Sequence, residues 1–216
     1  YYAKHYVPQN MAICISGNID PEETFKIIEK YFSAWENPQP LRKEPKWVEK
    51  PLNGREFVQV QYLGEEQLLM AFRTVPRFHR DYPALRLVDM ILDNSVAGLI
   101  NLNLVNQQKV RGAGCFPINY NDYGAHYLMG SPKDGQSLED VEKLLLDQIE
   151  QVKAGNFEDW ILPAVINDFK KKQKEDLESN AKRVELMRDS FLAYVEWQKM
   201  DSQIAELEKV SKEDIV

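Results

Sequence analysis

Residues 2–35 read YAKHYVPQNMAICISGNIDPEETFKIIEKYFSAW, and this stretch decides the fold. Within it, residues 11–16 alternate apolar side chains with small or polar ones, which is the period-2 pattern of a β-strand. A turn at residues 17–18 follows, and the remainder has helical spacing. A strand, a tight turn and an amphipathic helix cannot bury their own apolar faces, so this unit needs a sheet to cover.

The helix of this unit has a clear start signal. Asp20 offers a capping oxygen, Pro21 occupies the first helical position, and Glu23 falls three residues after the cap. Four apolar residues then recur on one face of the helix: Phe25, Ile28, Phe32 and Trp35. We expect this stripe to pack against a sheet, with Trp35 in the core.

The same stretch resembles the pitrilysin/insulinase family of zinc metallopeptidases, the inverzincins. The residues that carry the resemblance are Tyr6, Pro8, Asn10, Met11, Gly17, Asp20, Pro21, Tyr31 and Phe32. The similarity extends over nearly the whole chain and is looser beyond residue 40. In this family the pattern lies well downstream of an H-x-x-E-H zinc motif. The resemblance therefore implies a noncatalytic second domain preceded by the end of the first.

Composition excludes some classes of partner. The chain has 216 residues, 44% hydrophobic and 28% charged, and its net charge of −7 argues against binding nucleic acid. No apolar run approaches the roughly 18 residues of a membrane span, so no membrane partner is expected. The chain begins at Tyr1, inside a recognisable pattern, and we expect it to be an excised fragment. Its localisation stays open, because the bacterial periplasm and the cytoplasm both fit such a parent.

The chain is expected to contain two parts and a linker. Residues 1–36 are the terminal strand–helix unit of a preceding domain, residues 37–54 are a proline-rich linker, and residues 55–216 are a second domain. Strands are expected at residues 57–63, 68–74, 110–120 and 125–130, with helices opening near residues 82, 98, 137, 163, 180 and 211. This order predicts an α+β fold, in which helices pack on one face of an antiparallel sheet. The resemblance implies the same metallohydrolase domain.

Catalytic motifs are absent from the sequence. The three histidines, His5, His79 and His126, are far apart, and no H-x-x-E-H, H-E-x-x-H or C-x-x-C is present. We expect each histidine to lie at the surface or against aromatic rings, with His126 facing water. Cys14 and Cys115 are expected to be small buried hydrophobes. No catalytic residue, metal ligand or cofactor is assigned to this chain, and zinc would belong to the catalytic domain of an active parent.

Substrate-binding residues cannot be carried over from the family either. The resemblance implies an Arg and a Tyr seven residues apart that help to hold substrate. Alignment by eye places these two positions at Val105 and Gly112, so both are lost. A shifted alignment uses Arg111 and Tyr120, but their spacing is wrong. Substrate-binding residues therefore stay unknown, and the departure favours a noncatalytic partner.

Two functions follow from the resemblance. In the first, the chain is the noncatalytic, substrate-cleft portion of a zinc metallopeptidase, and binds extended peptide by strand addition. In the alternative, it is part of a catalytically inactive paralogue that serves as a structural or substrate-binding subunit. Its partners would be the catalytic domain of the same chain or a paralogous subunit, together with peptide substrate. An H-x-x-E-H motif upstream in the parent would distinguish the two, so enzyme activity stays undecided.

The two ends of the chain suggest how its parts fit together. Residues 210–215 open a helix that, in the family, precedes a Tyr-Pro lead-in and a hydrophobic strand like residues 1–16. The second domain thus lacks its own last strand, and residues 11–35 are a unit of the missing kind. We expect them to fill the vacancy within the chain, or between chains in a homodimer that exchanges residues 1–36. Docking within one chain would bring Tyr1 close to Val216.

Overall fold

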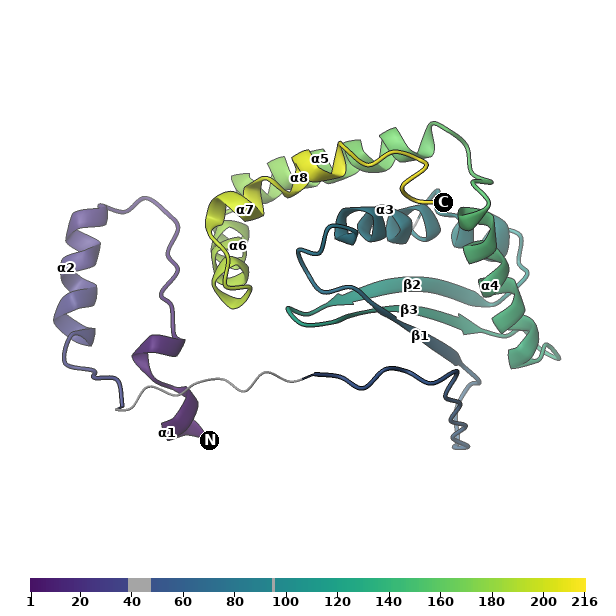
Figure 1. Cartoon of the computed structure of the whole chain (residues 1–216), viewed down its shortest axis with the longest axis horizontal. Helices are drawn as coiled ribbons and strands as arrows, with labels where there is room; N and C mark the ends of the chain where they lie inside the picture. The colour runs from purple at the N-terminus through teal and green to yellow at the C-terminus, as the bar shows by residue number, and fades with distance from the viewer. Residues whose placement is uncertain (39–47, 95) are drawn as a thin grey trace.

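The chain folds as an α+β body with a separate N-terminal unit beside it (Figure 1). The computed structural model describes residues 1–38, 48–94 and 96–216. The sheet of the body consists of β1 (Leu68–Thr74), β2 (Gly112–Asn119) and β3 (Gly124–Ser131). The strands are antiparallel in the order β1-β3-β2, with β2 and β3 forming a hairpin. The predicted fold class is therefore confirmed.

The register of the sheet determines which side chains face the helices. Met70 of β1 lies opposite Leu128 of β3, and Leu128 lies opposite Cys115 of β2. Leu128 is fully buried, and Met70 and Cys115 pack against the same core. Because side chains alternate along a strand, the neighbours Tyr127 and Phe116 point to the opposite face.

Helices cover one face of this sheet only, as Figure 1 shows. Two of them, α3 (Tyr82–Leu92) and α4 (Leu138–Lys153), pack directly on the strands. A second layer packs on α3 and consists of α5 (Ile161–Glu178) and α8 (Gln203–Leu207). The remaining helical segments are the π-helix η2 (Asn101–Val105), α6 (Asn180–Leu192) and α7 (Trp197–Asp201). No helix among the described residues is long and apolar enough to cross a membrane.

The core lies between the sheet and these helices. Its fully buried side chains come from α3, η2, β3, α4, α5, α8 and the segment before η2: Leu87, Ile91, Leu92, Ile100, Leu104, Leu128, Val141, Leu145, Val165 and Leu207. The apolar faces of α3 and α4 are thus among the surfaces that close this core. At the centre of the contact, Gly130 of β3 allows α4 to approach the sheet closely.

The N-terminal unit contains α1 (Tyr2–His5), the 3-10 helix η1 (Pro8–Asn10) and α2 (Pro21–Phe32). The predicted cap of α2 is confirmed, because Asp20 Oδ1 accepts a hydrogen bond from the backbone N–H of Glu23 at 2.9 Å. Pro21 occupies the first turn as expected. The local signals in this stretch therefore determine where its helix begins.

The strand predicted at residues 11–16 is wrong for this chain. These residues are extended but pair with none of the described strands. Ser16 donates a hydrogen bond to Asn180 Oδ1 of α6 at 3.1 Å, which places the segment beside a helix rather than a sheet. A strand is defined by its ladder, and the sheet of the body ends at β1 and β2 without accepting this segment.

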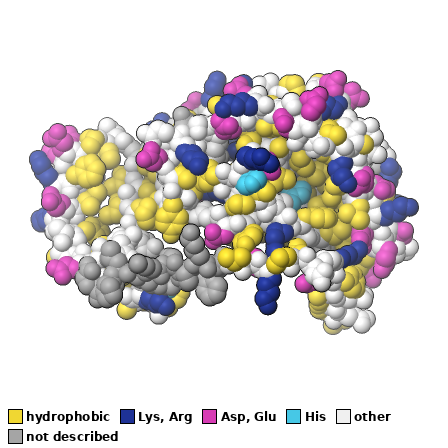
Figure 2. Space-filling model, viewed as in Figure 1, with side chains coloured by type: hydrophobic (Ala, Val, Ile, Leu, Met, Phe, Trp, Pro, Cys, Tyr) yellow, Lys and Arg dark blue, Asp and Glu magenta, His cyan; other side chains and the backbone are white. Residues whose placement is uncertain are grey.

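The prediction that the α2 stripe packs on a sheet is also wrong here. No residue of α2 is buried, and the side chain of Phe25 is 68% exposed. Trp35 is 40% exposed and is not a core residue. Figure 2 shows apolar side chains gathered on the surface of the N-terminal unit, at the left. The cause is the unpaired segment at residues 11–16, which supplies no sheet for the stripe to cover.

Docking of the N-terminal unit into the body of the same chain is contradicted as well. Residues 11–16 join none of the three strands, and Figure 1 places the N-terminus and the C-terminus far apart. Tyr1 therefore does not lie beside Val216. Exchange of residues 1–36 between two chains stays a prediction.

Two smaller expectations also differ from the structure. Residues 57–63 form no strand, and their apolar side chains are exposed. Residues 211–215 form a turn instead of a helix. Of the expected linker at 37–54, residues 39–47 lie outside the described residues.

Candidate functional site

The face of the sheet that carries no helix is the candidate binding surface, and we call it the open sheet face. It is formed by the outward side chains of the three strands: Leu69, Ala71, Arg73, Phe116, Ile118, Ala125, Tyr127 and Met129. Leu69 is 57% exposed, and Phe116 stacks on Tyr127 with ring centroids 5.1 Å apart. An apolar face of this kind, left in water, is typical of a surface that contacts a partner.

A polar hollow lies at one end of the open sheet face. It is lined by Glu49, Arg73, Tyr120, Asp122 and Tyr123. The Arg73 guanidinium donates to the carbonyl of Lys50 at 2.7 Å and lies over the ring of Tyr123. The Tyr123 hydroxyl accepts a hydrogen bond from the N–H of Glu49 at 3.0 Å. The hollow therefore adds hydrogen-bonding groups beside an apolar surface.

The outer edge of β1 is the second binding feature. In the described part of the chain, β1 pairs with β3 only, so the N–H and C=O groups along its other edge have no strand partner. An unpaired edge of seven residues can accept an extended peptide as an added strand. The open sheet face and this edge adjoin each other, so one ligand can contact both.

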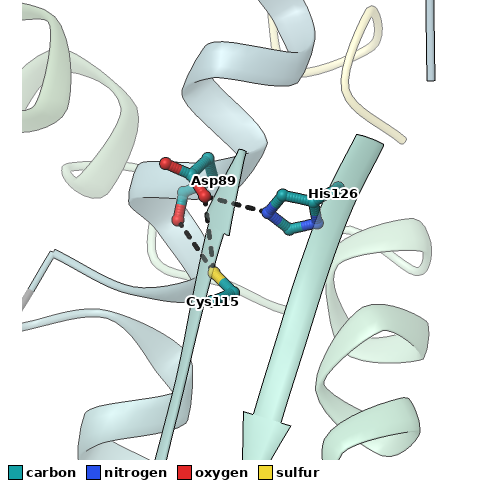
Figure 3. A group of neighbouring side chains, drawn as sticks. All are labelled: Asp89, Cys115 and His126. Carbon is teal, nitrogen blue, oxygen red and sulfur yellow. Dashed lines mark hydrogen bonds and ion pairs between the residues drawn. The ribbon is translucent and has the colours of Figure 1, made fainter. Parts of the chain in front are cut away.

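A separate polar cluster lies on the helical side of the sheet. Figure 3 shows Asp89 of α3, Cys115 of β2 and His126 of β3 pointing toward one another. His126 Nε2 is 2.9 Å from Asp89 Oδ1, and the Cys115 thiol donates to the same oxygen at 3.5 Å. The side chains of His126 and Asp89 are only 13% and 16% exposed, so the expectation that His126 faces water is wrong.

The register of the hairpin explains this correction. His126 lies opposite Pro117 and Cys115 lies opposite Leu128, so the two side chains are diagonal neighbours on the helical face. Asp89 reaches them from the last turns of α3, which packs on β2. The strands predicted at residues 110–120 and 125–130 are separated by a short connection, which could have indicated this pairing. Treating His126 alone, without its cross-strand neighbours, missed the cluster.

The electrostatics of the cluster favour a neutral thiol. Burial raises the pKa of the Cys115 thiol far above its usual range, and the carboxylates of Asp89 and Asp93 raise it further. Asp93 also accepts a hydrogen bond from the N–H of Cys115 at 3.1 Å. A protonated thiol donates a hydrogen bond, whereas metal binding requires the thiolate.

Among the described residues, these three side chains are the group whose donor atoms could surround a metal ion. Their ligand atoms all lie within 4.8 Å of one another. The residue types suit zinc, but the atoms that would bind the metal already form hydrogen bonds with one another. The thiol must also lose its proton before a metal binds. We interpret the cluster as a buried polar network that fixes α3 on the hairpin.

The other candidate residues from the sequence do not meet. His5 stacks on Tyr1 in the N-terminal unit, with ring centroids 4.4 Å apart. His79 Nδ1 accepts a hydrogen bond from the N–H of Asp81 at 3.2 Å in the loop before α3. Cys14 is partly exposed in the extended N-terminal segment, whereas Cys115 lies in β2. The histidines therefore occupy three different places, as their spacing predicted.

The alternative substrate pair, Arg111 and Tyr120, flanks β2 at its two ends. The eight residues of β2 lie between them and separate them by roughly 30 Å, too far to hold one substrate residue together. Arg111 instead forms an ion pair with Glu65 at 2.8 Å. Val105 and Gly112, the positions from the first alignment, supply no polar side chain. At these two pairs of positions, all within the described residues, no Arg–Tyr pair is assembled.

The sequence pattern described as "Peptidase M16 inactive domain" matches residues 1–169. The chain belongs to this family. The match covers the N-terminal unit and most of the body, which agrees with the resemblance to pitrilysin-type peptidases. The family description calls this domain inactive, so we expect no catalytic zinc in it.

Solved structures share the fold at low sequence identity. A protease from Helicobacter pylori covers 99% of this chain with a TM-score of 0.87 and 15% identity. The periplasmic protease PqqL from Escherichia coli covers 92% with a TM-score of 0.70 and 14% identity. A chain of complex III2 from Candida albicans covers 99% with a TM-score of 0.73 and 15% identity.

The chain is shorter than these solved structures. It spans about half of the Helicobacter pylori protease and of the Candida albicans chain, 52% in each case, and 22% of PqqL. No curated protein matches the sequence. The similarity to these structures therefore establishes the fold of this chain. It does not establish the activity of a longer protein that contains the chain.

Proposed function

We propose that the chain forms the noncatalytic wall of the substrate cleft in a zinc-dependent M16 metallopeptidase. On this proposal, residues 1–36 end the zinc-bearing domain, residues 37–54 are the linker, and residues 55–216 are the second domain without its last strand. The observation that carries the proposal is the open sheet face beside the unpaired edge of β1. The zinc, the attacking water and the general base belong to the other domain.

The peptide would bind to this wall in an extended form. Backbone groups along the β1 edge pair with the peptide backbone, which gives affinity without dependence on sequence. Leu69 and Phe116 contact apolar side chains, and Arg73 at the polar hollow holds an acidic group or a carbonyl. The cleft then aligns the scissile bond with the zinc domain, which is a positioning effect on catalysis.

The second candidate is a catalytically inactive paralogue that acts as a structural or substrate-binding subunit. Two observations favour it: the similarity to a chain of a multisubunit assembly, complex III2, and the absence of an Arg–Tyr pair at the aligned positions. The partner would then be a paralogous active subunit. An H-x-x-E-H motif in the parent gene supports the first function, and its absence supports the second.

Binding of a fluorescent extended peptide, measured by anisotropy, tests the cleft wall. We expect Phe116→Asp to weaken binding at least about tenfold, because it removes an aromatic contact and places a charge on the open sheet face. Trp160→Asp is the matched control, since this exposed aromatic residue precedes α5 in the helical layer. Equal losses in both variants, or no loss in either, would contradict the proposal.

Metal content and cleavage give a second test. The purified chain should carry no stoichiometric zinc and should cleave no peptide, because the catalytic zinc belongs to another domain. Elemental analysis after desalting and a fluorogenic peptide assay measure both. About one tightly held zinc per chain, lost in His126→Gln, would assign the metal to the Asp89–Cys115–His126 cluster and overturn this expectation.

A further inference from the structure

A small cavity lies in the helical layer, on the side of α3 away from the sheet. Its volume is about 120 Å³, and its walls include Arg86, Phe169, Trp197, Met200, Gln203 and Ile204. These residues come from α3, α5, α7 and α8. The cavity is separate from the open sheet face and plays no part in the proposed cleft.

Arg86 brings a positive charge into the cavity wall with only neutral groups in contact. It donates a hydrogen bond to Gln203 Oε1 at 3.2 Å, and its guanidinium lies 4.5 Å from the ring centroid of Phe169. Burial lowers the pKa of Arg86 and the charge of Arg77 lowers it further, whereas Tyr82 and the carboxylate of Asp89 oppose this shift. An arginine nevertheless stays protonated in proteins, so the charge is present and poorly compensated.

Arg77 contacts Met200 of the cavity wall and places a second positive charge beside it. Its Nη2 contacts the sulfur of Met200 at 3.8 Å, and its buried Nε has no hydrogen-bond partner. Gln203 Nε2 donates to the same sulfur at 3.5 Å. A thioether is a weak acceptor, so two donors converge on a group that satisfies neither. An oxygen anion at this position would satisfy both.

The nearby carboxylates are engaged elsewhere. Asp176 lines the cavity but forms an ion pair with Lys172 at 2.8 Å. Asp89, which follows Arg86 in α3, is bound to His126. Lys199 lies over the ring of Phe78, which Arg77 also contacts, so a third cation approaches from α7. Among the described side chains, no carboxylate lies within ion-pair distance of Arg77 or Arg86.

We propose that this cavity binds a small carboxylate that bears a compact apolar group. The guanidinium of Arg86 pairs with the carboxylate, because buried charges require a partner of opposite sign. The rings of Phe169 and Trp197 surround the apolar group. The cavity, at about 120 Å³, is somewhat smaller than the apolar cavity of about 150 Å³ that holds a benzene ring, so a single ring is the upper limit for the apolar group. A free organic acid and the C-terminus of a peptide both present this chemistry.

Calorimetric titration of the chain with benzoate, benzamide and inorganic phosphate tests the proposal. Benzoate should bind at least about tenfold more tightly than benzamide, which has the same shape without the charge. Equal binding of the two would overturn the assignment of an anion site. Phosphate binding tighter than benzoate would overturn the carboxylate assignment. A tripeptide ending in Phe, with a free or an amidated C-terminus, distinguishes a peptide end from a free acid as the source.

Substitutions locate the site. Arg86→Gln should weaken benzoate binding at least about tenfold, and Arg77→Gln should weaken it by a smaller factor. Arg80→Gln is the matched control, because this neighbouring arginine is 88% exposed and already lies beside Asp81. If Arg86→Gln does not fold, the thermal shift produced by benzoate in Arg77→Gln decides the question. Unchanged benzoate affinity in the folded cavity variants would overturn the proposal.

Discussion

Helices α2 and α4 have similar sequence patterns but very different environments. Each begins with a side-chain cap, Asp20 in α2 and Ser137 in α4, and each has acidic residues in its first turn. Each also has an apolar stripe on one face. Yet α4 buries Val141, Leu145, Gln148 and Val152, whereas α2 buries no residue at all. The same local pattern has therefore given one core helix and one exposed helix.

The difference lies in what each stripe meets. The stripe of α4 packs on β3, where Gly130 leaves room for Val141 and Leu145. The stripe of α2 follows an extended segment that has no strand partner among the described residues. An amphipathic pattern thus predicts a helix and the face that requires a partner, but the partner must be supplied by the rest of the fold.

The largest expected effect is the loss of the α4 contact. Leu145→Ala should lower the free energy of unfolding by about 2–5 kcal/mol, because it leaves a cavity at a fully buried position. The matched change in the other helix, Ile27→Ala, should cost less than about 0.5 kcal/mol, since Ile27 is exposed. Urea unfolding followed by circular dichroism measures both. Similar costs would show that α2 is buried in solution.

The sequence predicted the body well and the N-terminal unit poorly, for one physical reason. The strand at 68–74, the helix near 82 and the hairpin after residue 110 carry strong local signals, and their partners lie in the same chain. Residues 11–16 and 57–63 alternate just as clearly, but they pair with nothing described. Alternation reports a preference for a pleated ladder, and a ladder needs a second strand.

The candidate sites also depend on contacts between distant parts of the chain, which local sequence patterns do not specify. Helices on one face of the sheet were predicted, and the open sheet face is the consequence of that arrangement. The Asp89–Cys115–His126 cluster depends on the register of a hairpin and on the rotation of α3, which no short motif encodes. The cavity beside Arg86 is closed by helices more than 80 residues away in the chain, so short sequence motifs could not have predicted it.

A moderate effect is expected from filling the space beneath α4. Gly130→Ala should destabilise the chain by about 1–3 kcal/mol, because the added methyl would lie 2.5 Å from Val141 Cγ1 and 3.1 Å from Leu145 Cδ1. Gly112→Ala is the control, since nothing lies within 4 Å of a methyl added there. Thermal unfolding compares the two. If the two variants were equally stable, α4 would not approach the sheet as closely as described.

Cys115 should make the body sensitive to alkaline pH. The pKa of the Cys115 thiol is raised in the folded chain, whereas in the unfolded chain it has the usual value of about 8.5. Below that pH the thiol is protonated in both states, so it does not change the free energy of unfolding as pH varies. Above that pH the unfolded chain loses a proton that the folded chain keeps, and stability falls. The loss should reach about 1.4 kcal/mol at one pH unit above that value.

The comparison of two cysteine variants isolates this effect. Unfolding free energies between pH 7 and pH 10 should show a shallower decline for Cys115→Ala than for the unchanged chain. Cys14→Ala should follow the unchanged chain, because Cys14 lies in the N-terminal unit and outside the polar network. Parallel curves for all three proteins would contradict the burial of the Cys115 thiol.

The smallest effect is expected at Trp35, and it bears most directly on the comparison of the two helices. Trp35→Ala should change the free energy of unfolding of the chain by no more than about 0.5 kcal/mol, because its side chain is 40% exposed and covers no sheet. Denaturant unfolding followed by circular dichroism at several protein concentrations measures it. A loss above about 2 kcal/mol would show that the stripe of α2 is covered in solution. If that loss also increased with protein concentration, the cover would come from a second chain, as exchange of residues 1–36 in a homodimer requires.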